Sequence, residues 1–176
     1  MFMTLPSENR SDRALALLLI VAGVFFRILP HMDNFTPTMA IALFSGAVLP
    51  ASLALTVPVL VMMASDLFIG LHGLFWLVWA SFLMVVMIGI WVRQKAGLWR
   101  AAAGTLASSV LFFFLTNLGV FLFENMYPRD WEGFVHCYAM ALPFFRNSLA
   151  SDMVYTFSLF SLFFAARWMK QPKKAF

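Results

Sequence analysis

The sequence predicts an all-α integral membrane protein, a single domain over residues 1–176 that folds as a six-helix bundle with both termini in the cytoplasm. Two observations support this fold class. Hydrophobic residues make up 62% of the chain and charged residues only 11%, which is too little charge to cover the surface of a soluble domain. The apolar residues also form runs long enough to cross a bilayer, for which a helix needs about 20 residues.

Six apolar segments, separated by prolines, glycines or charged residues, each predict one helix. Pro30 ends the first segment, and the second is short for a full span. Pro58 lies inside the third, where neighbouring helices can satisfy the carbonyl that a proline leaves free. A basic turn follows the fourth segment, and a polar stretch from Glu124 to about His136 precedes the sixth. The predicted helices cover residues 13–29, 38–49, 51–71, 73–92, 99–123 and 146–168.

The distribution of basic residues predicts the orientation of the bundle. With six spans, both chain ends and the turn between the fourth and fifth helices share one side of the membrane. Nine of the twelve Lys and Arg residues fall there: Arg10, Arg13, Arg93, Lys95, Arg100, Arg167, Lys170, Lys173 and Lys174. The positive-inside rule makes that side cytoplasmic. We therefore expect a multi-pass protein of the bacterial cytoplasmic (inner) membrane, whose first helix is not cleaved because no small-residue cleavage site follows it.

Several function classes are disfavoured by the remaining residues. Cys137 is the only cysteine, so no internal disulfide can form. The net charge is +4, but the sequence has no basic stripe, and we do not expect nucleic acid as a partner. It contains no G-x-S-x-G, H-E-x-x-H or Walker motif, and His31, His72 and His136 lack the spacing of metal ligands. We expect neither enzyme activity, nor catalytic residues, nor a cofactor, nor a metal site.

Polar side chains occur inside the predicted membrane segments or at their edges, and the clearest examples are Arg27, Asp66, Asn117 and Asp152. An ionisable group inside a membrane costs a few kcal/mol or more, so it normally faces protein or water. Two arrangements fit these residues. They line a polar pocket that opens to the outer side, or they form interhelical ion pairs and hydrogen bonds that hold the bundle together.

The last predicted helix carries a polar stripe among apolar residues. Its members are Ser148, Asp152, Tyr155 and Thr156. Their three- and four-residue spacings place them on one helix face, which we expect to point into the bundle. Arg146 and Asn147 lie at the outer end of this stripe.

Aromatic residues are mixed with charged residues in the stretch that precedes this helix. Tyr127, Trp131 and Tyr138 accompany two acidic residues, an arginine and a histidine. Aromatic rings beside hydrogen-bonding groups suit a flat heterocyclic ligand. The alternative is an aromatic belt at the membrane interface, which needs no ligand.

Residues 14–168 resemble a known family of small membrane proteins. The segments that carry the resemblance are Arg27–His31, Asn34–Pro37, Ala42–Ala47, Ser65–Asp66, Gly70–His72, Thr116–Asn117 and Ala141–Leu149. Through them the chain is similar to the substrate-binding S-components of energy-coupling factor (ECF) vitamin transporters, and more narrowly to an uncharacterised bacterial membrane family of that fold. S-components often dock through an A-x-x-x-A pattern on their first helix, which Ala14, Leu18 and Ala22 match in part.

The resemblance implies a six-helix fold with a binding pocket near the outer surface. The pocket would be built from the first loop, the loop between the third and fourth helices, and the segment before the last helix. It also implies a partner on the cytoplasmic side, a coupling module with two ATPases and a scaffold subunit.

Together these patterns favour a membrane component that binds a small vitamin- or cofactor-like molecule from the outer side and helps it cross. The alternatives are a structural or assembly subunit of a larger membrane complex, without a ligand of its own, and a membrane enzyme. The partners expected are the substrate, the lipid bilayer and the ATPase and scaffold module. The candidate substrate-binding residues are Arg27, His31, Asn34, Phe35, Asp66, His72, Asn117, Tyr127, Trp131, Tyr138, Arg146, Asn147 and Asp152.

Overall fold

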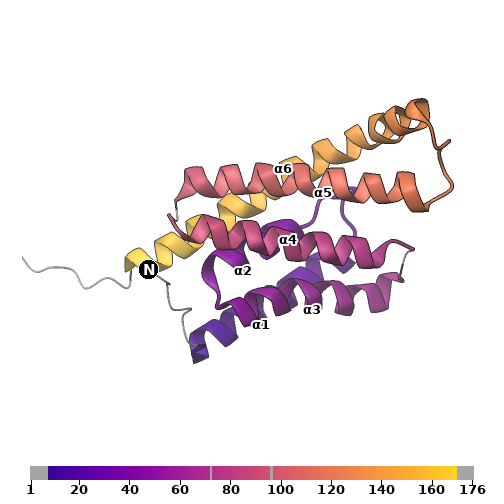
Figure 1. Ribbon diagram of the computed structural model, residues 1–176. Coiled ribbons are helices and arrows are strands. Elements are labelled where there is room, and N and C mark those ends of the chain that lie inside the picture. The colour runs from indigo at the N-terminus through magenta and orange to yellow at the C-terminus, as the bar shows by residue number, and fades with distance from the viewer. Residues whose placement is uncertain (1–7, 72, 96, 170–176) are drawn as a thin grey trace, which may run out of the picture.

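The computed structural model describes residues 8–71, 73–95 and 97–169, and within them it is all-helical, as predicted (Figure 1). The six helices of this described part are α1 (Arg10–Ile28), α2 (Thr38–Val48), α3 (Ala51–Ile69), α4 (Phe75–Arg93), α5 (Leu98–Phe123) and α6 (Trp131–Met169). Four of them, α3, α4, α5 and α6, are long enough and apolar enough to cross a membrane. α1 is as long as α3 but carries charges near both of its ends. α2 has only 11 residues, about half of a full span.

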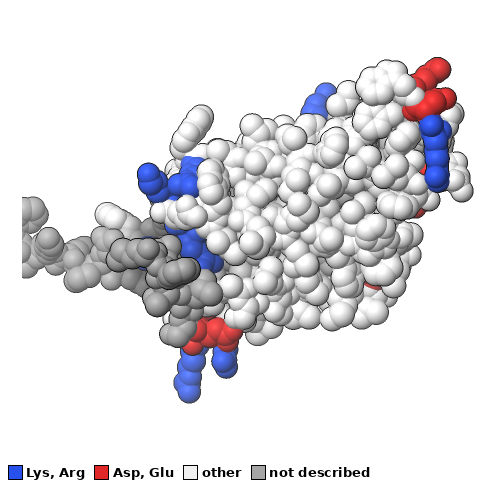
Figure 2. Space-filling model, viewed as in Figure 1, with Lys and Arg blue, Asp and Glu red and all other residues white. Residues whose placement is uncertain are grey.

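The surface is that of a membrane protein. On the face shown in Figure 2, the charged residues gather mainly at two ends of the molecule and leave a broad uncharged band between them. Large apolar side chains point outward along the helices, and Leu67 and Leu162 are 80% and 70% exposed. Such a surface is unfavourable in water but matches the hydrocarbon of a bilayer.

The connections alternate between the two ends of the bundle. α1 begins and α6 ends at one end, where the α2–α3 and α4–α5 connections also lie (Figure 1). The opposite end holds the α1–α2 loop (residues 29–37) together with the α3–α4 and α5–α6 connections. We call this second end the loop end. The loop end carries few basic residues, because most of the Lys and Arg residues lie at the end that holds the chain termini.

α2 forms the centre of the bundle. Prolines bracket it, Pro37 before its first residue and Pro50 after its last, and they keep it short. It contacts all five other helices, and every residue from Thr38 to Ala47 is buried. Its closest neighbour is α4, where Gly46 lies against Gly89 and a Cβ atom on either glycine would overlap a carbonyl oxygen of the other helix. Small residues therefore let these two backbones touch.

Arg93 completes the C-terminal end of α2. Its guanidinium donates hydrogen bonds to the carbonyl oxygens of Gly46, at 2.6 Å, and of Leu49. Carbonyls at a helix C-terminus have no partner within the helix, and a cation is favourable there. An arginine predicted to lie in a basic turn is thus part of the packing of the central helix.

The prediction was wrong about where the last helix begins. α6 begins at Trp131 rather than at residue 146 and continues through Pro143. The Asp130 side chain accepts a hydrogen bond from the backbone N–H of Gly133 at 2.8 Å, which caps the helix at this earlier point. The 39 residues of α6 make a helix about 58 Å long, roughly twice the thickness of a bilayer core. It crosses the bundle obliquely (Figure 1).

The other predicted boundaries differ from the structure by three residues at most. α1 begins at Arg10, where Asn9 and Asp12 form a capping box that extends the helix into the polar N-terminal segment. α3 ends at Ile69 because Gly70 adopts a left-handed φ of 101°, which ordinary residues avoid.

Candidate functional site

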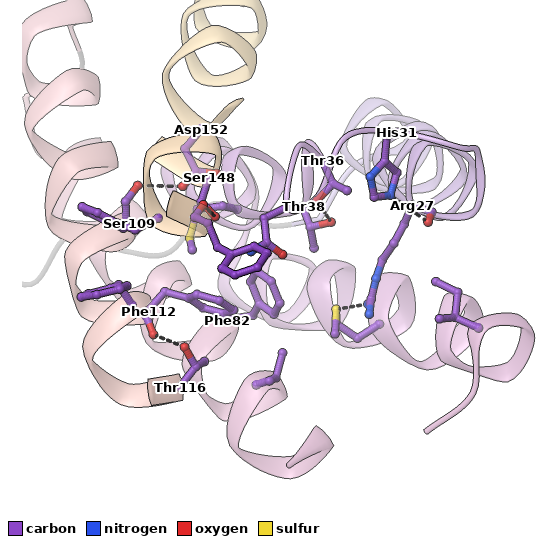
Figure 3. Close-up of a pocket in the computed structure, with 18 of the residues that line it drawn as sticks. Arg27, His31, Thr36, Thr38, Phe82, Ser109, Phe112, Thr116, Ser148 and Asp152 are labelled. Carbon is purple, nitrogen blue, oxygen red and sulfur yellow. Dashed lines mark hydrogen bonds between the residues drawn. The ribbon is translucent and has the colours of Figure 1, made fainter. Parts of the chain in front are cut away.

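A cavity of about 720 Å³ lies between the helices toward the loop end (Figure 3). All six helices and the α1–α2 loop contribute to its walls. His31 and Asn34 at its rim are exposed, whereas Thr38, Ser109 and Asp152 in its interior are buried. The volume is within the range of pockets that bind small molecules and cofactors, about 300–1,000 Å³.

Asp152 supplies a carboxylate to the interior of this cavity. It lies on α6 and is only 3% exposed. The hydroxyl of Ser109 on α5 donates a hydrogen bond to its Oδ2 atom at 2.7 Å (Figure 3). Neither ion pair in the described part of the chain includes Asp152. The carboxylate therefore faces the cavity with Ser109 as its single side-chain partner in the described part of the chain.

Another part of the cavity wall is lined by Arg27, which forms an ion pair that joins α1 to α3. Arg27 Nη2 lies 2.8 Å from Asp66 Oδ1, and the Asp66 side chain is only 2% exposed. Trp79 Nε1 on α4 donates a hydrogen bond to the other carboxylate oxygen at 2.9 Å. Arg27 also contacts the sulfur of Met62 (Figure 3). Arg27 lines the cavity, and Asp66 lies behind it.

Hydrogen bonds hold the α1–α2 loop against α6. The Ser151 hydroxyl donates to the carbonyl oxygen of Thr36 at 2.9 Å, and Asn147 donates to that of Asp33 at 3.5 Å. Asn34 is the one described non-glycine residue with a positive φ, 58°, a conformation that asparagine tolerates better than most residues. The loop that forms the rim of the cavity is thus tied to the helix that carries Asp152.

Phenylalanines form much of the remaining wall. Phe82 and Phe112 line the cavity with ring centroids 5.0 Å apart, and Phe113 and Phe145 do so with centroids 4.6 Å apart. In Figure 3, Phe82 and Phe112 lie near Ser109 and Asp152. The site therefore combines a buried carboxylate with aromatic surfaces.

Comparison with known proteins assigns the chain to a family. The sequence pattern described as "Family of unknown function (DUF6580)" matches residues 7–174. The chain belongs to this family. No curated protein and no solved structure matches it.

In this DUF6580 chain, part of the predicted site is brought together by the fold. The predicted residues that line the cavity are Arg27, His31, Asn34, Asn117 and Asp152. The polar stripe of α6 points into the bundle as predicted, because Ser148 and Asp152 line the cavity and Thr156 is buried. His72 lies outside the described residues, and the remaining predicted residues do not line the cavity.

Tyr127, Trp131 and Tyr138, the aromatic residues predicted to contact a ligand, do not line the cavity. Because α6 begins at Trp131, Trp131 and Tyr138 lie on a helix instead of in a loop, whereas Tyr127 lies in the α5–α6 connection. Trp131 is 77% exposed and stacks on Phe134, and Tyr127 packs against His136. The Tyr138 hydroxyl donates to the carbonyl oxygen of Phe114 at 2.8 Å, and neither residue lines the cavity.

Three other predicted residues lie near the cavity without lining it. Phe35 packs against Tyr155 at 6.0 Å between ring centroids. Arg146 is exposed on α6, and Asn147 bonds the α1–α2 loop instead of the cavity. Their chain neighbours Asn34 and Ser148 occupy the lining positions, because successive residues of a helix or turn point in different directions.

Sequence reasoning missed the contribution of α5. Ser109, Phe112 and Thr116 line the cavity, although only Asn117 of this helix was predicted to do so. The signal was present, since Thr105, Ser109 and Thr116 recur at spacings that place them on one face of an apolar helix. In a membrane, small polar residues on one face mark a surface that faces other helices or a cavity.

Proposed function

We propose that this protein is the substrate-binding component of an uptake system in the bacterial cytoplasmic membrane. It binds a small vitamin- or cofactor-like molecule from the outer side and helps it cross, with both of its termini in the cytoplasm. A cytoplasmic ATPase and scaffold module drives the release of the substrate. The resemblance to ECF S-components supports this division of labour, since the sequence carries no ATP-hydrolysis motif of its own.

The main support for this proposal is the cavity of about 720 Å³ toward the loop end. The positive-inside rule assigns the loop end to the outer side, because the basic residues cluster at the other end. A cavity with exposed residues at its rim and buried polar residues inside suits a ligand that enters from that side.

The second candidate function is that of a structural or assembly subunit of a larger membrane complex, and one specific contact favours it. The ion pair of Arg27 with Asp66 joins α1 to α3 and is further bonded by Trp79, as expected for polar groups that hold a bundle together. This reading does not account for Asp152 or for the cavity that it lines.

Filling the cavity is expected to remove a bound molecule. Native mass spectrometry of the detergent-purified full-length protein should detect a co-purified small molecule on the wild type. Ser148→Phe places a ring at a lining position and should lower its occupancy at least about tenfold, which corresponds to roughly 1.4 kcal/mol.

Ser158→Phe on the same helix is the matched control. Both serines donate a hydrogen bond to the carbonyl oxygen four residues earlier, but Ser158 is exposed and does not line the cavity. It should keep the molecule. If the wild-type protein carries no bound molecule, or if the two variants bind it equally, the protein is better explained as a structural or assembly subunit.

Topology is tested separately from binding. Reporter fusions after residue 174 and at Arg129 should report opposite compartments, the cytoplasm for the first and the outer side for the second. The physical reason is the excess of Lys and Arg near both chain ends. If both fusions report the same compartment, the proposed orientation of the cavity is wrong.

A further inference from the structure

We propose that the ligand carries a positively charged nitrogen, which pairs with Asp152 beside Ser109. This inference rests on the proposed function and narrows its substrate to an organic cation, such as an aromatic amine or a charged nitrogen heterocycle. Three features of the cavity lead to it: a buried carboxylate with no cationic partner among the described residues, aromatic walls and a volume suited to a small organic molecule.

The first feature is the charge on the walls of the cavity. Arg27 is neutralised by Asp66 at 2.8 Å, so it offers little net attraction to an anion. Asp152 has one hydrogen bond, from Ser109, and no cation within ion-pair distance among the described residues. Removing a charge from water is costly unless a partner compensates it. A cationic ligand supplies that partner.

The second feature is the aromatic surface. Phe82, Phe112, Phe113, Phe144 and Phe145 all line the cavity. The face of an aromatic ring carries a partial negative charge, so it attracts cations and disfavours anions. The rings therefore favour a positively charged ligand, as Asp152 does. They also supply the flat apolar contact that an organic cation needs beyond its charged group.

The third feature is size, which separates an organic cation from a bare metal ion. The cavity of about 720 Å³ is far larger than the cage of a single ion, which needs several oxygen ligands within about 2.6 Å. The described residues contain no group of three or more His, Cys, Asp or Glu side chains that could hold a metal ion. Thr38, Thr116 and Ser148 line the cavity as well and can bond polar substituents of an organic molecule.

The test separates small molecules by charge. A bacterial metabolite extract is divided by ion-exchange resin at neutral pH into cationic, neutral and anionic pools. Each pool is added to the full-length protein in detergent, and thermal unfolding and native mass spectrometry report binding. The cationic pool should raise the unfolding temperature of the wild type and give a mass adduct, and the other two pools should not.

Two variants then assign the effect to the carboxylate. Asp152→Asn is nearly isosteric and should weaken binding of the cationic pool at least about tenfold, because a charge-assisted contact is lost. Glu132→Gln removes one negative charge from an exposed position of the same helix and should bind like the wild type. If Asp152→Asn does not fold, Asp152→Glu keeps the charge and should still select the cationic pool over the other two.

Each remaining outcome is decisive. Binding by the neutral or anionic pool alone overturns the inference and leaves the proposed function standing. Unchanged binding of the cationic pool to Asp152→Asn also overturns it, because the charge is then recognised elsewhere. Binding by none of the pools counts against the proposed function itself, and the inference falls with it.

Discussion

Replacing Asp66 with leucine while Arg27 is kept is expected to destabilise the protein by about 3–5 kcal/mol. The substitution removes both the carboxylate 2.8 Å from Arg27 Nη2 and the acceptor for Trp79 Nε1. The Arg27 side chain is only 16% exposed, so water replaces little of the lost interaction. An unpaired charge and an unpaired indole N–H then remain inside the bundle. Thermal or denaturant unfolding in detergent measures the loss.

The double variant Arg27→Met/Asp66→Leu tests the physical reason. It removes both charges together, so it should be more stable than Asp66→Leu alone, as is found when buried ion pairs are replaced as a whole. Asp33→Leu is the control, since Asp33 is exposed and, among the described residues, only its backbone carbonyl accepts a hydrogen bond. If the double variant is no more stable than Asp66→Leu, the unpaired charge of Arg27 is not the cause of the lost stability.

Gly89→Ala should also lower the free energy of unfolding by about 2–3 kcal/mol, although a Gly→Ala substitution in a helix usually raises it. In a helix, alanine is normally better than glycine by about 1 kcal/mol. Here the added Cβ would overlap the carbonyl oxygen of Leu43 and lie 2.9 Å from the Cα atom of Gly46. α2 is buried on all sides, so its backbone cannot move away without displacing another helix. The unfolding temperature in detergent is the measurement.

The same substitution should disturb the cavity, because Thr38 and Met39 on α2 line it. Ligand occupancy by native mass spectrometry is therefore expected to fall together with stability. Gly97→Ala serves as the control, since nothing lies within 4 Å of a Cβ atom built there. Equal stability of the two alanine variants would mean that the α2–α4 contact is looser than the structure shows.

Much of the fold was predictable because its determinants are local in the sequence. Runs of apolar residues predicted six helices, and Pro30 predicted where the first of them ends. The start of α6 was missed since the polar stretch before it resembles a loop. Its capping residue, Asp130, and the helix that follows it are recognisable only once the chain is seen to continue through Pro143.

Local patterns of apolar and polar residues predicted that the chain is a bundle of apolar helices and that charged residues lie inside it. Which of those residues bond one another was decided by tertiary structure. Asp66 and Asp152 are chemically identical and lie in similar apolar surroundings in the sequence. Among the residues that the structure describes, Asp66 bonds Arg27 and Trp79, whereas Asp152 bonds Ser109 alone. Their partners lie 13 to 43 residues away, on other helices. Local sequence patterns do not encode which helix faces touch, because that depends on how side chains of different helices fit together.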